Sequence, residues 1–314
     1  MYLQSIDSIE PTDELVGGKA ANMAIMSKRG FNVPATLILS HSLLTDIAPE
    51  LVKVFDDLDL DIAKNISNAC STAKNIISGI EIPDSFFTDT KEANKLRELL
   101  KLGAVVRSSG ALEDSSSASF AGCYETYFGA RSIDTLKKLI IKCWMSSVTP
   151  EVLLYKRKNS ISGFVPISIL IQEQIQCEKA GVCFSKAPLQ KDGGVALIES
   201  NWGSCVSIVS GTVAPDRFYV ELQSKVISKE LGKKHTYSLL CDSGAVSIET
   251  PDDIQRMFSL SNEEIGAVTE KAIELKLIFG CEVDVEWGFS KEELVLFQCR
   301  PITTLFCNDH PKKV

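Results

Sequence analysis

Apolar positions follow two different periods in the two halves of the chain. Residues 42–102 carry them mostly at helical spacing, broken at Pro49 and Pro83, and residues 133–158 form another helical stretch. From Val165 onward, short apolar runs separated by polar residues predict strand after strand. The pattern therefore predicts a first half rich in helices and a second half that is richer in sheet.

Local start and stop signals define several individual elements. A helix is expected over residues 20–29, and Gly30 ends it. Ser261 and Glu264 form a capping box before a last helix that stops at Gly280. The predicted strands cover residues 36–39, 104–106, 168–175, 181–184, 195–199, 218–222, 282–287 and 294–299.

A long polar segment, residues 107–126, follows the predicted strand at 104–106. It holds Arg107, a cluster of serines and the glycine-containing stretch 119–122. Loops of this length inside a compact domain tend to be functional or disordered. Such a loop could close as a lid over triphosphate oxygens while Arg107 neutralises their charge. A solvated serine-rich loop would show the same composition, so both interpretations stay open.

A glycine pair, Gly17 and Gly18, stands directly before the helix at residues 20–29, with Lys19 beside it. Backbone N–H groups at a helix N-terminus attract anions, and the lysine adds a positive charge, so the turn could hold a phosphate. The spacing fits neither the GxxxxGK[ST] nor the GxGxxG pattern. An ordinary turn that caps a helix is the alternative interpretation.

The last two predicted strands carry polar side chains with a period of two. Asp284 and Glu286 share one face of their strand, and the apolar residues around them share the other. On the next strand Gln298 and Arg300 again share a face. This hairpin could offer a carboxylate and a carbonyl oxygen to Mg²⁺ and a guanidinium to phosphates. An exposed surface hairpin would show the same alternation, which periodicity cannot distinguish.

The composition of the 314 residues narrows the class of partner. An apolar fraction of 45% suffices for a large core, and the formal charge of −8 argues against a general binder of nucleic acid or anionic membranes. No apolar run approaches the roughly 20 residues of a membrane helix, and no secretory signal opens the sequence, so we expect a cytoplasmic protein. The ten cysteines lack CxxC spacing, which predicts reduced, packed thiols.

Four separated segments form a joint pattern. They are residues 17–22, then 106–109 with 113–114 and 119–122, then 210–211 with 215–217, and finally 284–287 with 298–303. In this order and spacing, the chain resembles over nearly its whole length the ATP-binding domain of the pyruvate phosphate dikinase and phosphoenolpyruvate synthase family, which includes the rifampin phosphotransferases.

That resemblance implies an ATP-grasp-type α+β fold in two subdomains, with ATP and Mg²⁺ between them. We expect an N-terminal subdomain with phosphate-binding loops at residues 1–164. A sheet-rich subdomain with the metal-binding strands is expected at residues 165–305, followed by a flexible tail at 306–314.

The resemblance also implies a set of site residues. The positions that match the family's ATP-binding residues are Lys19, Arg107, Gly122, Thr126, Gln172, Glu286, Gln298 and Arg300. Glu286 and Gln298 are the expected Mg²⁺ ligands. The expected catalytic residues are the cations that would stabilise phosphate charge, namely Lys19, Arg107 and Arg300.

Two parts of the match are less regular. Residues 171–174 contain two glutamines near the expected adenine pocket, and the position in the strand favours Gln172 over Gln174. The family often has a glycine-rich Trp-Gly-Leu-Gly-Glu stretch where residues 202–206 carry Cys205 and Val206 instead. This departure bears on how phosphate is handled.

The acceptor of the transferred group is a separate question. Family members use a histidine in a glycine-rich context on a later domain, and His41, His235 and His310 lie outside such a context. We expect ATP-dependent phosphoryl or pyrophosphoryl transfer to a histidine on a separate phosphohistidine-domain protein, or directly to a small-molecule acceptor. Alternatives are a ligase-like or adenylating activity on a small molecule, and a non-catalytic nucleotide-binding regulatory subunit.

Overall fold

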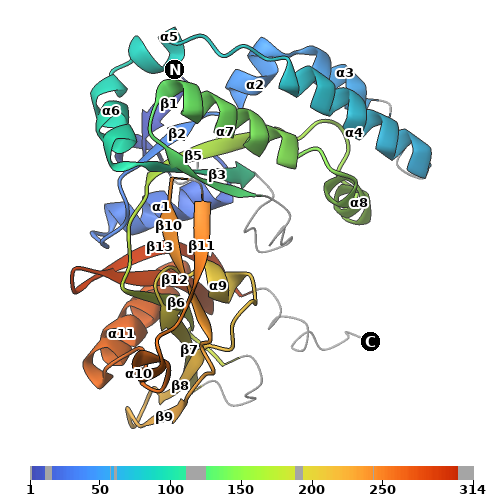
Figure 1. Cartoon of the computed structure of the whole chain (residues 1–314). Coiled ribbons are helices and arrows are strands. Elements are labelled where there is room, and N and C mark those ends of the chain that lie inside the picture. Colours follow the sequence, from blue (N-terminus) through green and yellow to red (C-terminus); the bar gives the residue numbers. More distant parts are fainter. Residues whose placement is uncertain are drawn as a thin grey trace, which may run out of the picture. The chain divides into compact units, whose positions relative to one another are not determined.

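Figure 1 shows the computed structural model, which describes residues 2–10, 16–56, 58–59, 62–110, 125–187, 194–242 and 244–302. The described residues of Met1–Lys28, Ala35–Gln174 and Asp242–Gly244 form a first unit. Those of Arg29–Pro34, Ile175–Cys241 and Ala245–Val314 form a second unit.

The first unit extends past the predicted subdomain boundary at residue 164. Strand β5 (Ile167–Glu173) pairs with β2 (Thr36–Leu39) on one side and with β3 (Ala104–Gly110) on the other. Strands β2 and β3 both belong to the first unit, and β5 belongs to it because it pairs with them. The predicted tail at 306–314 lies outside the described residues.

Five antiparallel strands form the sheet of the first unit. Their order across the sheet is β1 (Leu3–Ser5), β2, β5, β3 and β4 (Thr126–Ala130). Strand β3 is longer than the predicted strand at 104–106, because its ladder with β5 continues until Gly110 pairs with Ile167. Arg107 and the two serines after it therefore belong to a strand, and the prediction that placed them in a loop was wrong.

The helices of the first unit follow the predicted helical stretches. They are the 3-10 helix η1 (Ile6–Ser8), α1 (Gly18–Lys28), α2 (Ser42–Ile47), α3 (Glu50–Asp56), α4 (Ala63–Ser78), α5 (Ser85–Thr88), α6 (Ala93–Leu102), α7 (Ile133–Ser146) and α8 (Pro150–Lys158). The single stretch predicted at 133–158 is two helices. Thr149 caps a new N-terminus by accepting the N–H of Val152, and Pro150 occupies the first turn.

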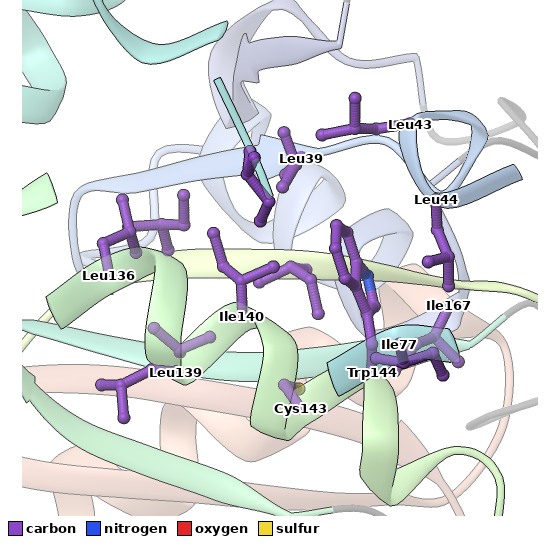
Figure 2. Packing of buried hydrophobic residues seen from close by; sticks show 14 of the residues in the cluster. Leu39, Leu43, Leu44, Ile77, Leu136, Leu139, Ile140, Cys143, Trp144 and Ile167 are labelled. Carbon is purple, nitrogen blue, oxygen red and sulfur yellow. The ribbon is translucent and has the colours of Figure 1, made fainter. Parts of the chain in front are cut away.

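Helix α7 covers one face of this sheet. Its residues Leu136, Ile140 and Trp144 are fully buried in one cluster with Leu39 and Ile167 (Figure 2). Each buried side chain of this size stabilises the fold by about 1.5–3 kcal/mol. Since side chains alternate along a strand, the residues between the core positions point to the opposite face, where α1 contacts β3.

Six antiparallel strands form the main sheet of the second unit. Their order is β13 (Glu293–Pro301), β12 (Val283–Ser290), β6 (Lys179–Phe184), β7 (Val195–Trp202), β8 (Asp216–Glu221) and β9 (Ile227–Glu230). A separate hairpin consists of β10 (Thr236–Cys241) and β11 (Gly244–Glu249). The last three of these strands were not predicted. They are largely unburied, so no run of core residues marks them in the sequence.

Helix α11 (Asn262–Phe279) contacts β12, β13 and β6, where Trp287 is fully buried. Its predicted capping box is confirmed, since Ser261 and Glu264 each accept the backbone N–H of the other. Gly280 ends the helix at a φ of 68°, in the left-handed region. The short helices α9 (Val206–Val209) and α10 (Asp252–Gln255) complete this unit. Within the described residues, no helix combines the length and apolar character needed to cross a membrane.

A fully buried ion pair joins strand β8 to the chain after β9. Asp216 and Lys234 are both 0% exposed and bonded to each other. Asp216 also accepts the backbone N–H groups of Gly232 and Ser259, each at 2.8 Å. Because a buried carboxylate is stable only when its lone pairs are satisfied, this part of the 215–217 motif is a structural anchor.

The described cysteines are free thiols, of which five are buried. Burial raises the pKa of Cys177 to about 12, so that thiol stays protonated at neutral pH. Burial likewise raises the pKa of Cys183. These thiols behave as small apolar side chains. Five of the described cysteines are thus packed as predicted, and their reduced state stays a prediction.

Candidate functional site

The face of the first sheet away from α7 collects polar residues from four strands. Arg107 lies directly opposite Leu170 and Thr126 in the ladders of β3 with β5 and β4. Gln172 is opposite Thr36 of β2. Residues opposite each other in an antiparallel pair share a face, as do residues two apart on one strand. Three predicted site residues, Arg107, Thr126 and Gln172, therefore lie on one face.

Hydrogen bonds order the centre of this face. Arg107 Nη1 donates to Gln172 Oε1 at 3.4 Å, and Gln172 Nε2 donates to Thr36 Oγ1 at 3.2 Å. The hydroxyl of Thr36, which is 0% exposed, thus orients the amide so that its carbonyl faces the guanidinium. The side chain of Gln174 has another partner: its Oε1 accepts the backbone N–H of Gly129 at 2.9 Å. The two glutamines therefore have different partners, and the choice of Gln172 stays a prediction.

The glycine turn before α1 lies against the end of β3. Ser109, two residues beyond Arg107 on the same face, accepts the backbone N–H of Ala20 at 3.0 Å. Gly17 has a φ of 77°, and a Cβ there would lie 2.4 Å from the carbonyl oxygen of Ser109. Only glycine allows so close an approach. The N-terminus of an 11-residue helix, with Lys19 as its second residue, is thereby held beside the polar face.

In the second unit, the hairpin β12–β13 carries the other predicted residues. Glu286 pairs with Gln298, and Asp284 pairs with Arg300, so all four share one face as predicted. Asp284 Oδ2 accepts both Nε and Nη2 of Arg300, at 2.9 Å and 2.7 Å. Of the two carboxylates, Asp284 is thus bound to the arginine, and Glu286 lies beside the glutamine.

The pair Glu286 and Gln298 fits a magnesium ion by the chemistry of its donors. Carboxylate and amide oxygens on directly opposite residues lie within reach of a single ion, and Mg²⁺ prefers oxygen ligands. The described residues contain no group of three or more His, Cys, Asp or Glu that could hold a metal. A two-residue site of this kind is completed by water and by oxygens of a phosphate ligand.

A register shift follows the pair immediately. Glu286 pairs with Gln298, but Trp287 pairs with Leu296, which leaves an extra residue, Phe297, on β13. Such bulges occur next to functional sites because they redirect a side chain. On the other face, Trp287 is fully buried, so the bulge stands on a packed layer.

The structure thus brings the predicted residues together in two groups. Lys19, Arg107, Thr126 and Gln172 lie in the first unit, and Glu286, Gln298 and Arg300 lie in the second. Gly122 lies outside the described residues.

Sequence reasoning missed three supporting residues, Thr36, Ser109 and Asp284 in its bond to Arg300. Thr36 gains its role only through strand pairing, for which the sequence carries no signal. Ser109 belongs to the 106–109 segment of the family pattern, but its bond to α1 depends on helix packing. The two-residue spacing of Asp284 and Glu286, matched by Gln298 and Arg300, was a usable signal for the third.

Comparison with known proteins places this arrangement in a family. Residues 13–313 match the family described as "Pyruvate phosphate dikinase, AMP/ATP-binding domain". The chain belongs to this family. The match covers nearly the whole chain, and the resemblance predicted from four sequence segments is confirmed. The α+β class predicted with it is confirmed by the two units of helix and sheet.

Several named proteins are similar to this family member. A "Probable phosphoenolpyruvate synthase" of Methanocaldococcus jannaschii is 28% identical over 99% of this chain. Two Bacillus subtilis proteins, "Uncharacterized phosphotransferase YvkC" and "Rifampicin phosphotransferase", are 32% and 28% identical over 100% and 96% of it. The chain spans 27% of the first relative and 36% of each of the other two.

One solved structure shows a distant likeness to the chain. A D-alanine–D-alanine ligase from Bacillus anthracis superimposes on 90% of this chain and on 56% of its own, with a TM-score of 0.37 and 8% identity. A likeness at this level carries no argument about the site.

Proposed function

We propose that this chain binds Mg-ATP in an ATP-grasp-like manner and serves as the nucleotide-binding part of a dikinase-type phosphotransferase. The observation that carries the proposal is the meeting of Arg107, Gln172 and the N-terminus of α1 on one polar sheet face. These groups come from three distant segments, and each is of a type that binds nucleotides. Membership of a family named for AMP/ATP binding supports it.

The roles follow from the chemistry of each group. Arg107 and Lys19, beside the N-terminus of α1, stabilise phosphate charge in the first unit. Gln172, held by Thr36, offers a fixed amide to the nucleotide. Glu286 and Gln298 hold Mg²⁺, which when bound neutralises phosphate charge and orients the triphosphate. Arg300 adds a second guanidinium.

The acceptor lies beyond the residues that carry the nucleotide. We propose transfer of a phosphoryl or pyrophosphoryl group to a histidine on a separate phosphohistidine domain, with direct transfer to a small molecule as the second route. The relatives named phosphoenolpyruvate synthase and rifampicin phosphotransferase support phosphotransfer over ligation. We place the activity in the cytoplasm, where thiols such as the free cysteines stay reduced.

The test is turnover of ATP labelled at the α- and γ-phosphates, with Mg²⁺ and with and without candidate acceptors. Label from the γ-phosphate on a histidine partner, with AMP as product, supports the dikinase. Release of ADP with a γ-labelled small molecule supports direct transfer, whereas release of pyrophosphate with the α-label bound to an acceptor would indicate adenylation instead. Replacing Glu286 by Gln should lower turnover by about 10²–10³-fold, a loss typical of a removed transition-state contact.

Glu293 provides the matched control, because it begins β13 on the same hairpin and is exposed. Glu293→Gln should leave turnover and nucleotide binding unchanged. Magnesium-dependent ATP binding that is equal in the wild type and in Glu286→Gln would contradict the proposed metal site. Binding without turnover in the presence of every acceptor would favour a regulatory subunit.

A further inference from the structure

Two carboxylates stand two residues apart on β12 and face the same way, yet their surroundings differ. The Asp284 side chain is 7% exposed, and one of its oxygens accepts two N–H groups from Arg300. Glu286 is only half-buried and lies opposite the neutral Gln298. A period of two in the sequence makes these carboxylates equivalent, but the structure does not.

We propose that Asp284 is a positioning residue that holds the Arg300 guanidinium for a phosphate group, and that the metal is carried by Glu286 with Gln298. This inference rests on the proposed function of the same site. The two bonds to Oδ2 come from Nε and from Nη2, which lie on one edge of the planar guanidinium. Two hydrogen bonds to one edge of a guanidinium fix its plane, so the opposite edge of the group keeps a constant direction.

The physical gain is preorganisation. A free arginine side chain has many rotamers, and ordering them when a ligand binds reduces affinity and misplaces the charge. Arg300 is 34% exposed, so it reaches solvent while its inner edge is held by a nearly buried partner. Such a fixed charge stabilises a transition state better than a mobile one, because no reorganisation is needed during the reaction.

The same contact argues against Asp284 as a metal ligand. Its Oδ2 already receives two N–H groups from a cation, and a divalent ion on that carboxylate would stand against the guanidinium charge. Glu286, on the same face, stands opposite the neutral Gln298 in the strand pairing. The two carboxylates on this strand thus have different roles: Asp284 positions an arginine, and Glu286 binds the metal.

Asp216 shows what a purely structural aspartate looks like in this unit. It is 0% exposed, its lysine partner is also 0% exposed, and its other donors are Ser259 and a backbone N–H. Arg300, in contrast, is partly exposed on the face that carries Glu286. The partner of Asp284 can therefore meet a ligand, and the partner of Asp216 cannot.

The test uses the full chain, with calorimetric ATP binding at varied Mg²⁺ and with labelled turnover. Asp284→Asn keeps the shape of the side chain and removes its charge. We expect kcat to fall about 10–30-fold, as for a displaced catalytic cation, while KM for ATP and the Mg²⁺ midpoint of binding change less than about threefold. Glu286→Gln should shift the Mg²⁺ midpoint by about tenfold or more.

A double-mutant cycle decides whether Asp284 acts through Arg300. If it does, Asp284→Asn combined with Arg300→Lys should lose no more kcat than Arg300→Lys does by itself. Losses that multiply, or a Mg²⁺ midpoint that shifts in Asp284→Asn as it does in Glu286→Gln, would overturn the inference. Thermal unfolding of each variant separates these effects from misfolding.

Asp284→Glu offers a second variant if the asparagine destabilises the hairpin. It keeps the charge but moves it by one methylene, and kcat should again fall while the Mg²⁺ midpoint stays near the wild-type value. Full kcat in this variant would contradict a positioning role. Absence of Mg²⁺-dependent ATP binding in the wild type would refute the proposed function itself, which is a different outcome from either of these.

Discussion

The two units of the molecule each present a polar sheet face, but they assemble it in different ways. In the first unit, the hydrogen bonds join residues far apart in the chain, such as Gln172 and Thr36, which are 136 positions apart. In the second unit, Glu286 and Gln298 stand on neighbouring strands of one hairpin. The first face is therefore a product of topology, and the second is largely a product of local pattern.

This difference has consequences for stability and for tolerance of substitution. A face built by distant segments depends on every contact that docks those segments, including the close approach of Gly17 to Ser109. A face built by one hairpin depends on the layer beneath it, where Trp287 is fully buried, and on the anchors of the surrounding sheet.

The largest expected effect concerns the anchor of the second unit. Asp216→Asn leaves Lys234 as a buried charge without its carboxylate, so the free energy of unfolding should fall by about 3–5 kcal/mol. Chemical denaturation measures this loss, and Asp252→Asn, an exposed aspartate in α10, is the control with an expected change below about 0.5 kcal/mol. Unchanged hydrogen exchange in β12 and β13 of Asp216→Asn would show that the stability of this hairpin does not depend on the Asp216–Lys234 anchor.

A smaller loss is expected where α1 docks in the first unit. Gly17→Ala places a Cβ 2.4 Å from the Ser109 carbonyl oxygen at a φ of 77°, so we expect a loss of about 2–3 kcal/mol and weaker ATP binding. Gly30 has a φ of 79°, but a Cβ added there would meet no atom within 4 Å beyond its chain neighbours. Gly30→Ala therefore isolates the cost of the backbone strain, about 1 kcal/mol. Equal losses in the two variants would show that the contact with β3 is unimportant.

The pH dependence of stability distinguishes the buried cations of the two units. Burial lowers the pKa of Lys156 in α8 to about 8 from an ordinary value of 10.5, whereas Lys234 in the second unit is paired with a carboxylate. Below pH 8, Lys156 is charged in both the folded and the unfolded state and burial destabilises the fold. Between about pH 8 and 10.5 the folded state loses its proton first, so this contribution to stability rises by roughly 3 kcal/mol.

Lys156→Met should abolish that rise, as seen in denaturation midpoints measured across this pH range. Lys158→Met, an exposed neighbour in the same helix, should retain it. A rise that persists in Lys156→Met would assign the pH dependence to another group.

The smallest expected effect tests how the first face is ordered. Thr36→Val removes the oxygen that accepts Gln172 Nε2, so the amide loses its fixed orientation, and ATP affinity should fall about fivefold, or about 1 kcal/mol. Equilibrium binding measures it, with Thr45→Val in α2 as the control. Unchanged affinity in Thr36→Val would mean that Gln172 is positioned by its strand and not by this bond.

The structure also shows which expectations the sequence could support. The capping box at Ser261, the helix before Gly30 and the alternation on β12 depend on residues within a few positions of one another, and all three are found as predicted. The extension of β3 past Val106 depends on partners in β5, some sixty residues later, and the loop predicted there was wrong. The strand β11 was not predicted, and the structure shows that it places no side chain in the core.

The sequence by itself therefore determined many of the helices and core strands, the α+β class and the family, because periodicity, caps and motif spacing are properties of short segments and of their order. It also determined the chemistry of the candidate residues, from Lys19 to Arg300. Three contacts were decided only by the tertiary structure. Thr36 orients Gln172, Ser109 accepts the backbone N–H of Ala20 in α1, and Asp284 accepts two N–H groups of Arg300. These choices depend on strand register and packing, which join positions that no local pattern connects.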